Sequence, residues 1–506
     1  MALLSGGISL DDISIADDPA FSTEPFLTAK AVDVGVEWLP LIFSKQVRVR
    51  SFRLQAPQVV LRRSASGTWN FSSLGTSSSG SQNGSAAAAS AVGGSAASGS
   101  AASPSAAGGS PSAANVSVQR LTMASGRVTV IGTPASHGKT RLYDNVTLDA
   151  TDLSYTSQFP FRVSANTPGG GTVKLDGKAG PFNPADAAQT PFQATLVVTH
   201  LDLASTGLND PASGLAGLID GTADLVSDGR QVTSRGKSHL NQFQFVQGGS
   251  PARVPVEIDY ASDYDLKTQA GVVKEGDVHI GKALAQLTGD YNTGGETTAV
   301  RLKLSGHQMP VPELEATLPA IGVTLPAGAS LQEGTADIDL AINGPLDRLV
   351  TTGPMNLSNT KVKGFNLSSR MGSVASLAGL PSSSDTLIQT FSSTLSIAPD
   401  GTRAETLNLV VPAIGSLTGS GTIAPNGALD FTMLAKLTNS STVARGVSRY
   451  ASLGNPENGI PFRIGGTTAN PVFVPDVSGA VASVVKSPGS AKAATGLLGG
   501  FLSKKK

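Results

Sequence analysis

The chain has no cysteine among its 506 residues. This absence excludes disulfide bonds, thiolate metal sites and a cysteine nucleophile. A protein without thiols suits an oxidising, extracytoplasmic compartment, although cytosolic proteins can lack cysteine as well. The absence of cysteine therefore excludes several kinds of chemistry but does not determine the cellular compartment.

Charged and aromatic residues are also scarce. Only 15% of the residues are charged, and 37 basic residues balance 37 acidic ones. Without net charge the chain has no long-range field that attracts nucleic acid, so we expect no nucleic-acid partner. Aromatic residues make up 5% of the chain, so a core must be built mainly from valine, leucine, isoleucine and alanine.

Long apolar runs are missing too. The first residues, from Met1 to Gly7, have neither a basic region nor an apolar core, so they do not resemble a signal peptide. No window approaches the roughly 18 uninterrupted apolar residues of a membrane-spanning helix. The sequence predicts neither an export signal nor a transmembrane segment in this chain.

What the sequence contains instead is a succession of short runs in which apolar and polar residues alternate. Such a period of two is typical of half-buried β-strands, and it occurs at 127–131, 172–178, 195–203, 221–226, 336–342 and 406–411. Turn pairs recur between the runs, for example Asp228-Gly229 and Asn426-Gly427, and such pairs favour hairpins. We therefore predict a mainly all-β protein with a long, largely antiparallel sheet.

Helical spacing is confined to a few short segments. Leu314, Leu318 and Ile321 would share one helix face, which predicts a helix over 311–321. Further candidates are 370–380 and 441–453. Residues 477–506 form a weakly amphipathic tail that ends in three lysines, for which we favour a flexible, solvated tail over a membrane-surface segment.

Composition divides the chain into five predicted regions. Residues 75–114 are almost entirely serine, glycine and alanine, so we predict a disordered linker there. It separates N-terminal strands (1–74) from a β-rich middle region (115–309), a C-terminal region (310–476) and the tail (477–506). Because residues 1–74 are too few for a comfortable domain, we expect them to form the first strands of the same sheet.

The sequence gives only weak indications of catalytic or metal-binding sites. The histidines lie far apart, without the short spacing of a metal site. Asp337 and Asp339 alternate with apolar neighbours, as on the solvent face of a strand, and Gly169-Gly170-Gly171 precedes a strand, which favours a hairpin turn over a phosphate loop. We predict a non-enzymatic protein with no catalytic residue, cofactor or metal, and keep a hydrolase with a cryptic carboxylate pair as the weakest alternative.

The most informative segments resemble the AsmA family of envelope proteins. They include an alternating strand that leads into Asp18-Pro19-Ala20-Phe21, the run from Pro57 to Leu61, and Gly67-Thr68-Trp69-Asn70. Segments near the end are similar to the AsmA-like C-terminal region, among them Gly364-Phe365-Asn366-Leu367 and Ile460-Pro461-Phe462. The resemblance covers about 10–74 and 310–476. The chain lacks the N-terminal transmembrane helix that usually begins such proteins.

The resemblance implies a twisted sheet that forms a groove and holds phospholipid, in a protein that supports outer-membrane assembly. It further implies a periplasmic location, association with the inner membrane, and other envelope-assembly proteins as partners. Alternation then predicts the lipid-facing positions, which are Val59, Leu61, Val128, Val130, Ile338, Leu340, Leu407 and Leu409. A scaffold or interaction protein that binds no lipid remains the alternative, and the sequence leaves open whether helices seal the apolar face.

Overall fold

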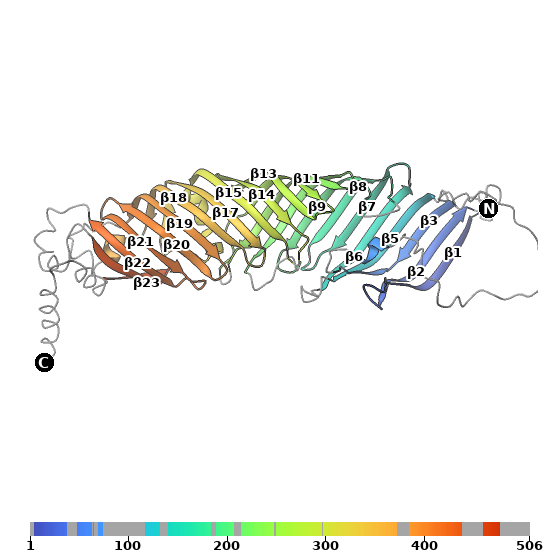
Figure 1. Cartoon of the computed structure of the whole chain (residues 1–506), viewed down its shortest axis with the longest axis horizontal. Helices are drawn as coiled ribbons and strands as arrows, with labels where there is room; N and C mark the ends of the chain where they lie inside the picture. The colour runs from blue at the N-terminus through green and yellow to red at the C-terminus, as the bar shows by residue number, and fades with distance from the viewer. Residues whose placement is uncertain are drawn as a thin grey trace, which may run out of the picture.

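The computed structural model describes residues 5–37, 48–62, 64, 69–73, 117–131, 140–183, 189–206, 214–246, 249–295, 297–371, 384–437 and 459–475. Within this part of the chain, 24 strands form a single sheet, which confirms the all-β prediction. The strands follow one another in sequence order along the long axis of the molecule and run obliquely to it (Figure 1).

The first half of the sheet comprises β1 (Ser5–Ala16), β2 (Pro25–Glu37), β3 (Arg48–Gln55), β4 (Gln58–Arg62), β5 (Ser117–Ile131), β6 (Thr140–Leu153), β7 (Phe159–Asn166), β8 (Thr172–Ala179), β9 (Phe192–Asp202), β10 (Ala216–Ser227), β11 (Gln231–Gln244) and β12 (Val256–Asp265). A short 3-10 helix, η1 (Asn70–Ser73), follows β4.

The second half comprises β13 (Ala270–Ile280), β14 (Ala283–Asn292), β15 (Ala299–Pro310), β16 (Ser330–Gln332), β17 (Thr335–Pro345), β18 (Val350–Lys363), β19 (Thr386–Ala398), β20 (Gly401–Val411), β21 (Gly415–Ile423), β22 (Leu429–Leu437), β23 (Ile460–Thr467) and β24 (Asn470–Pro475). The predicted helix over 311–321 is present as two pieces, α2 (Val311–Glu315) and η5 (Leu318–Ile321). A third helix, α3 (Leu367–Arg370), begins before the predicted 370–380.

The N-terminal strands belong to the same sheet as the rest. β3 and β4 pair in parallel with β5, and both pair antiparallel with β2. The expected continuity of residues 1–74 with the main body is thereby confirmed for the described strands. Several predicted features lie outside the described residues: the linker, the helix at 441–453, the tail, most of 370–380, and Trp38. The boundaries of the five regions stay predictions.

Beyond β5, successive strands pair antiparallel except at the short β16, which pairs with β18 while β15 pairs with β17. The predicted turn chemistry forms hairpins among these strands. Between β10 and β11, Asp228 Oδ1 accepts hydrogen bonds from the backbone N–H groups of Arg230 and Gln231, both at 2.7 Å. Between β7 and β8, Gly169 and Gly170 adopt φ of 89° and 90°, which suits glycine. The glycine run is therefore a hairpin turn.

The turn at Asp228 predicts a measurable titration. The hydrogen bonds from the backbone of Gln231 and then Arg230 lower the pKa of Asp228 from its ordinary value of 3.8. Because the folded-state pKa is depressed, the turn's extra stability is present above pH 3.8 and is lost as the pH falls through the folded value. A carboxyl-carbon NMR titration should give a midpoint below 3.8 for Asp228. A midpoint at or above 3.8 would contradict the hydrogen bonding described here.

The two faces of the sheet differ sharply in polarity. One continuous ladder of directly paired residues is apolar: Leu148, Val163, Leu175, Leu196 and Ala223, on β6 to β10. The ladder one residue further along the same strands is polar and faces the other way: Asp149, Arg162, Asp176, Thr195 and Asp224. The sheet therefore has one apolar and one polar face over this stretch.

The apolar face lies on the inside of a bend in the sheet. We define the first rim by the described loop residues 203–206, 214–215, 245–246 and 249–255, and the second rim by the turns at 228–230, 424–428 and 468–469. Residues 316–324, here named the strap, join the two rims. Ala316, Pro319 and Ala320 accept backbone hydrogen bonds from the first-rim loop, and the N–H of Thr324 donates to Thr468 Oγ1 on the second rim at 3.3 Å.

The strap also reveals the geometry of the bend. Its first-rim contacts lie next to β11 and β12, whereas Thr468 lies between β23 and β24. Opposite rims can meet over so many strands only if the strands cross the bend obliquely, as Figure 1 shows. Ala320 of the strap is fully buried against Phe243 and Val256 of the apolar face. We therefore call the apolar face the inner face and the polar face the outer face.

Candidate functional site

The inner face is only partly covered over β6 to β10: Ala150, Phe159 and Ala223 on this face are buried, whereas other side chains keep accessible surface. On β8 the inner side chains Val173 and Leu175 are half-buried, and on β9 Leu196 and Val198 are half-buried as well. Among the described residues, the four buried apolar clusters include no side chain from these five strands. A row of branched apolar side chains thus keeps part of its surface accessible, which is unusual for the packed face of a sheet.

Elsewhere the inner face is covered. Val311 of α2 packs with Met309 and Ala336, and Ala320 of the strap packs with Phe243. Toward the C-terminal end, Leu367 and Met371 at α3 pack on strands β20 to β23, where Phe462 and Ala435 are fully buried. Helical segments therefore cover parts of the inner face, whereas over β6 to β10 half-buried side chains such as Leu175 and Leu196 remain partly accessible beside the buried Ala223.

The eight predicted lipid-facing residues all lie on strands and are all half-buried. The structure pairs four of them directly, Val59 with Val128 and Leu61 with Val130, on neighbouring strands β4 and β5. Ile338 packs beside the α2 cluster, and Leu407 and Leu409 pack against the C-terminal cluster. The sequence thus placed them at alternating strand positions, but it did not single out the half-buried ladder on β6 to β9, which lies between the β4–β5 pairs and β17.

The outer face is built from ion pairs between neighbouring strands. Lys237 Nζ lies 2.7 Å from Asp259, Lys303 Nζ lies 3.2 Å from Asp339, and Lys274 pairs with Asp263. The hydrogen bond from Lys274 lowers the pKa of Asp263, and the hydrogen bond to Asp259 raises the pKa of Lys237. These carboxylates are paired on an exposed face, as predicted for Asp339, and they lack the desolvated pocket that acid–base catalysis requires.

The segments around Asp18-Pro19 and Asn70, which the sequence singled out, meet in a buried polar network at the first rim. The side chain of Asp17 is 1% exposed and accepts hydrogen bonds from Asn70 Nδ2 at 3.1 and 2.9 Å. Asn70 Oδ1 accepts from the N–H of Arg62 at 3.0 Å, and Nδ2 also donates to the carbonyl of Val60. The Arg62 guanidinium lies 3.7 Å from the Asp17 carboxylate. The motif residues therefore anchor the end of β4 to the end of β1, and Trp69 stacks on Phe71 beside them.

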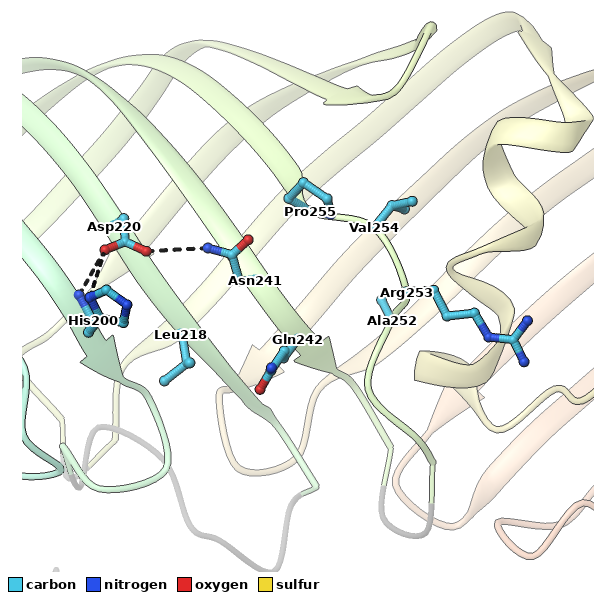
Figure 2. A pocket seen from close by; sticks show the side chains of 9 residues that line it. All are labelled: His200, Leu218, Asp220, Asn241, Gln242, Ala252, Arg253, Val254 and Pro255. Carbon is cyan, nitrogen blue, oxygen red and sulfur yellow. Dashed lines mark hydrogen bonds and ion pairs between the residues drawn. The ribbon is translucent and has the colours of Figure 1, made fainter.

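A small polar cavity of about 330 Å³ opens at the first rim, at the ends of β9, β10 and β11 (Figure 2). Asp220 lies at its centre and accepts from the N–H of His200 at 2.9 Å and from Asn241 Nδ2 at 3.3 Å. Leu218 and the segment 252–255 complete the lining. No sequence pattern indicates this cavity, because its residues converge only through the register of three strands.

The described residues contain neither a metal-binding cluster nor a membrane-spanning helix. No group of three or more histidines or carboxylates is placed to hold a metal ion in this part of the chain. None of the helices in the described ranges is both long and apolar enough to cross a bilayer.

Comparison with known proteins identifies a relationship for the N-terminal third of the chain. Residues 5–167 match the model of the AsmA family, a stretch that runs from β1 to the end of β7. Searches of curated proteins and of solved structures found no match. The match includes Asp17, Asn70 and the first strands of the accessible stretch, and it does not extend to the resemblance seen at 310–476.

Proposed function

We propose that this chain, a member of the AsmA family over residues 5–167, is a non-enzymatic envelope protein that holds phospholipid acyl chains on its inner face. The observation that carries the proposal is the apolar ladder Leu148, Val163, Leu175 and Leu196, whose four side chains are half-buried although they lie inside the bend. Family membership supports a role in envelope biogenesis.

Physical chemistry favours an acyl chain as the occupant. Covering apolar surface contributes about 25 cal/mol per Å² removed from water, and a flexible chain can follow a ladder of branched side chains. The adjacent rims carry polar turn residues, among them Asp228 and Thr468, beside which a headgroup would remain hydrated.

We further propose a periplasmic location, with association at the inner membrane, where the protein would support outer-membrane assembly and contact other envelope-assembly proteins. The accessible apolar stretch suits a protein that handles lipid between membranes, since a lipid needs shelter from water on such a path.

Lipid extraction tests the proposal. Protein purified from an envelope-containing bacterial host should carry phospholipid near stoichiometric amounts, as quantified by mass spectrometry of the organic extract. It should also take up a fluorescent fatty acyl chain from solution. A lipid-free protein that takes up no acyl chain would contradict lipid binding and favour the scaffold alternative.

A further inference from the structure

The strap is the feature that stands between the accessible and the covered parts of the inner face. It leaves α2 at Ala316 and reaches Thr324 within nine residues, while joining a loop beside β11 to a turn beside β24. Toward the N-terminus lies the accessible stretch over β6 to β10, and beyond the strap lie the inner positions of β17, among them Leu340.

The two attachments of the strap differ in strength. At the first rim three backbone hydrogen bonds hold it: Phe245 N–H to Ala320 at 2.9 Å, Ser250 N–H to Pro319 at 2.9 Å, and Arg253 N–H to Ala316 at 3.0 Å. Ala320 is also fully buried there. At the second rim, within the described residues, a single 3.3 Å hydrogen bond from the N–H of Thr324 to Thr468 Oγ1 holds it. Local opening starts where buried contacts and hydrogen bonds are fewest.

Two glycines with positive φ flank the attachment at Thr324. Gly322 adopts φ of 79°, and a Cβ at that position would make ordinary contacts with Val246 and with the carbonyl of Pro425. Gly328 adopts the same φ and has open space around it. Glycine at both positions lets the intervening residues change direction at low conformational cost. The strap is therefore held firmly at Ala316–Ala320, whereas its backbone near Thr324 can change direction at low cost.

We propose that the strap is a latch across the inner face, hinged at the first rim and released at Thr324–Thr468. Resting on the proposed lipid function, the inference is that acyl chains bind over β6 to β10 with the latch closed and reach β17 only when it opens. The latch thereby sets how far along the sheet a bound lipid extends.

Hydrogen exchange tests the latch without any lipid. Replacing Thr468 by valine removes the acceptor hydroxyl at constant shape, whereas Thr468→Ser retains it. The Thr324 amide should exchange about fivefold faster in Thr468→Val than in wild type, the size of effect that one net hydrogen bond produces. The amide of Phe245 at the hinge should not change in either variant. Equal acceleration at Thr324 and Phe245, or none at Thr324, would overturn the latch.

A cross-link tests the consequence for lipid. Because the chain has no cysteine, Thr324→Cys with Thr468→Cys creates one pair that a short bis-maleimide can bridge. With a phospholipid that carries a photoactivatable acyl chain, bridging should reduce adducts at Leu340 at least fivefold and leave those at Leu196 unchanged. Unchanged adducts at Leu340 would overturn the gating. If the unbridged protein forms no adducts at either position, the proposed lipid binding is contradicted. The hydrogen-exchange experiment then tests the latch by itself.

Discussion

Replacing Asn70 by aspartate should destabilise the N-terminal end of the sheet by about 3–5 kcal/mol, the range observed when a buried charge loses its compensation. The new carboxylate would face Asp17, whose side chain is 1% exposed and which now accepts two hydrogen bonds from Asn70 Nδ2. The change also removes the donor to the carbonyl of Val60. Arg62 cannot neutralise both carboxylates equally, because it already pairs with Glu24.

Urea unfolding followed by tryptophan fluorescence measures this loss of stability at the N-terminal end of the sheet. The chain has two tryptophans, Trp38 and Trp69, so the signal comes from its first 74 residues. The matched control is Asn426→Asp, the same chemical change in an exposed turn where the side-chain oxygen accepts from the N–H of Ala428. The control should leave the transition within about 0.5 kcal/mol of wild type. An Asn70→Asp transition equal to that of the control would refute the anchoring role of the motif.

Replacing Leu196 by aspartate should reduce bound phospholipid at least tenfold. Leu196 lies at the centre of the accessible ladder, between Leu175 and Ala223. A short carboxylate there cannot reach the rims to stay hydrated, so an acyl chain laid across it would bury a charge. Because the wild-type side chain is only half-buried, we expect a loss of stability of about 1–2 kcal/mol, less than for a fully buried leucine.

Thr199→Asp provides the control on the same strand. Thr199 is exposed and pairs with Thr172 of β8, on the outer face. Both variants are to be checked for folding by circular dichroism, and phospholipid per mole of protein is then measured in the organic extract. Lipid retained by Leu196→Asp, or lost equally in Thr199→Asp, would show that the inner face does not hold it.

Local pattern was sufficient to predict the class of fold. The period of two in runs such as 172–178 identified strands, and Asp228-Gly229 identified a hairpin that the structure contains. The same alternation separated Asp339 on the outer face from its apolar neighbours. These features depend on residues close in sequence, where side-chain direction and turn chemistry act directly.

Long-range features could not be predicted in the same way. Asn70 was recognised as a motif member, but its contact with Asp17 spans 53 positions and depends on how β1 and β4 end at the same rim. The strap joins Thr324 to Thr468 across 144 positions, because the strands cross the bend obliquely. Which part of the inner face stays accessible follows from that geometry, so sequence alone left an open groove and a sealed core equally plausible.

The most direct test of the account is to map where a bound acyl chain lies. Wild-type protein loaded with a phospholipid that carries a photoactivatable group near the end of one acyl chain would be irradiated, digested and analysed by mass spectrometry. The account predicts adducts on inner residues of β6 to β10, such as Leu175, Leu196 and Val198, and none on the outer positions of the same strands. Adducts spread over both faces, or confined to residues outside these strands, would contradict the central claim.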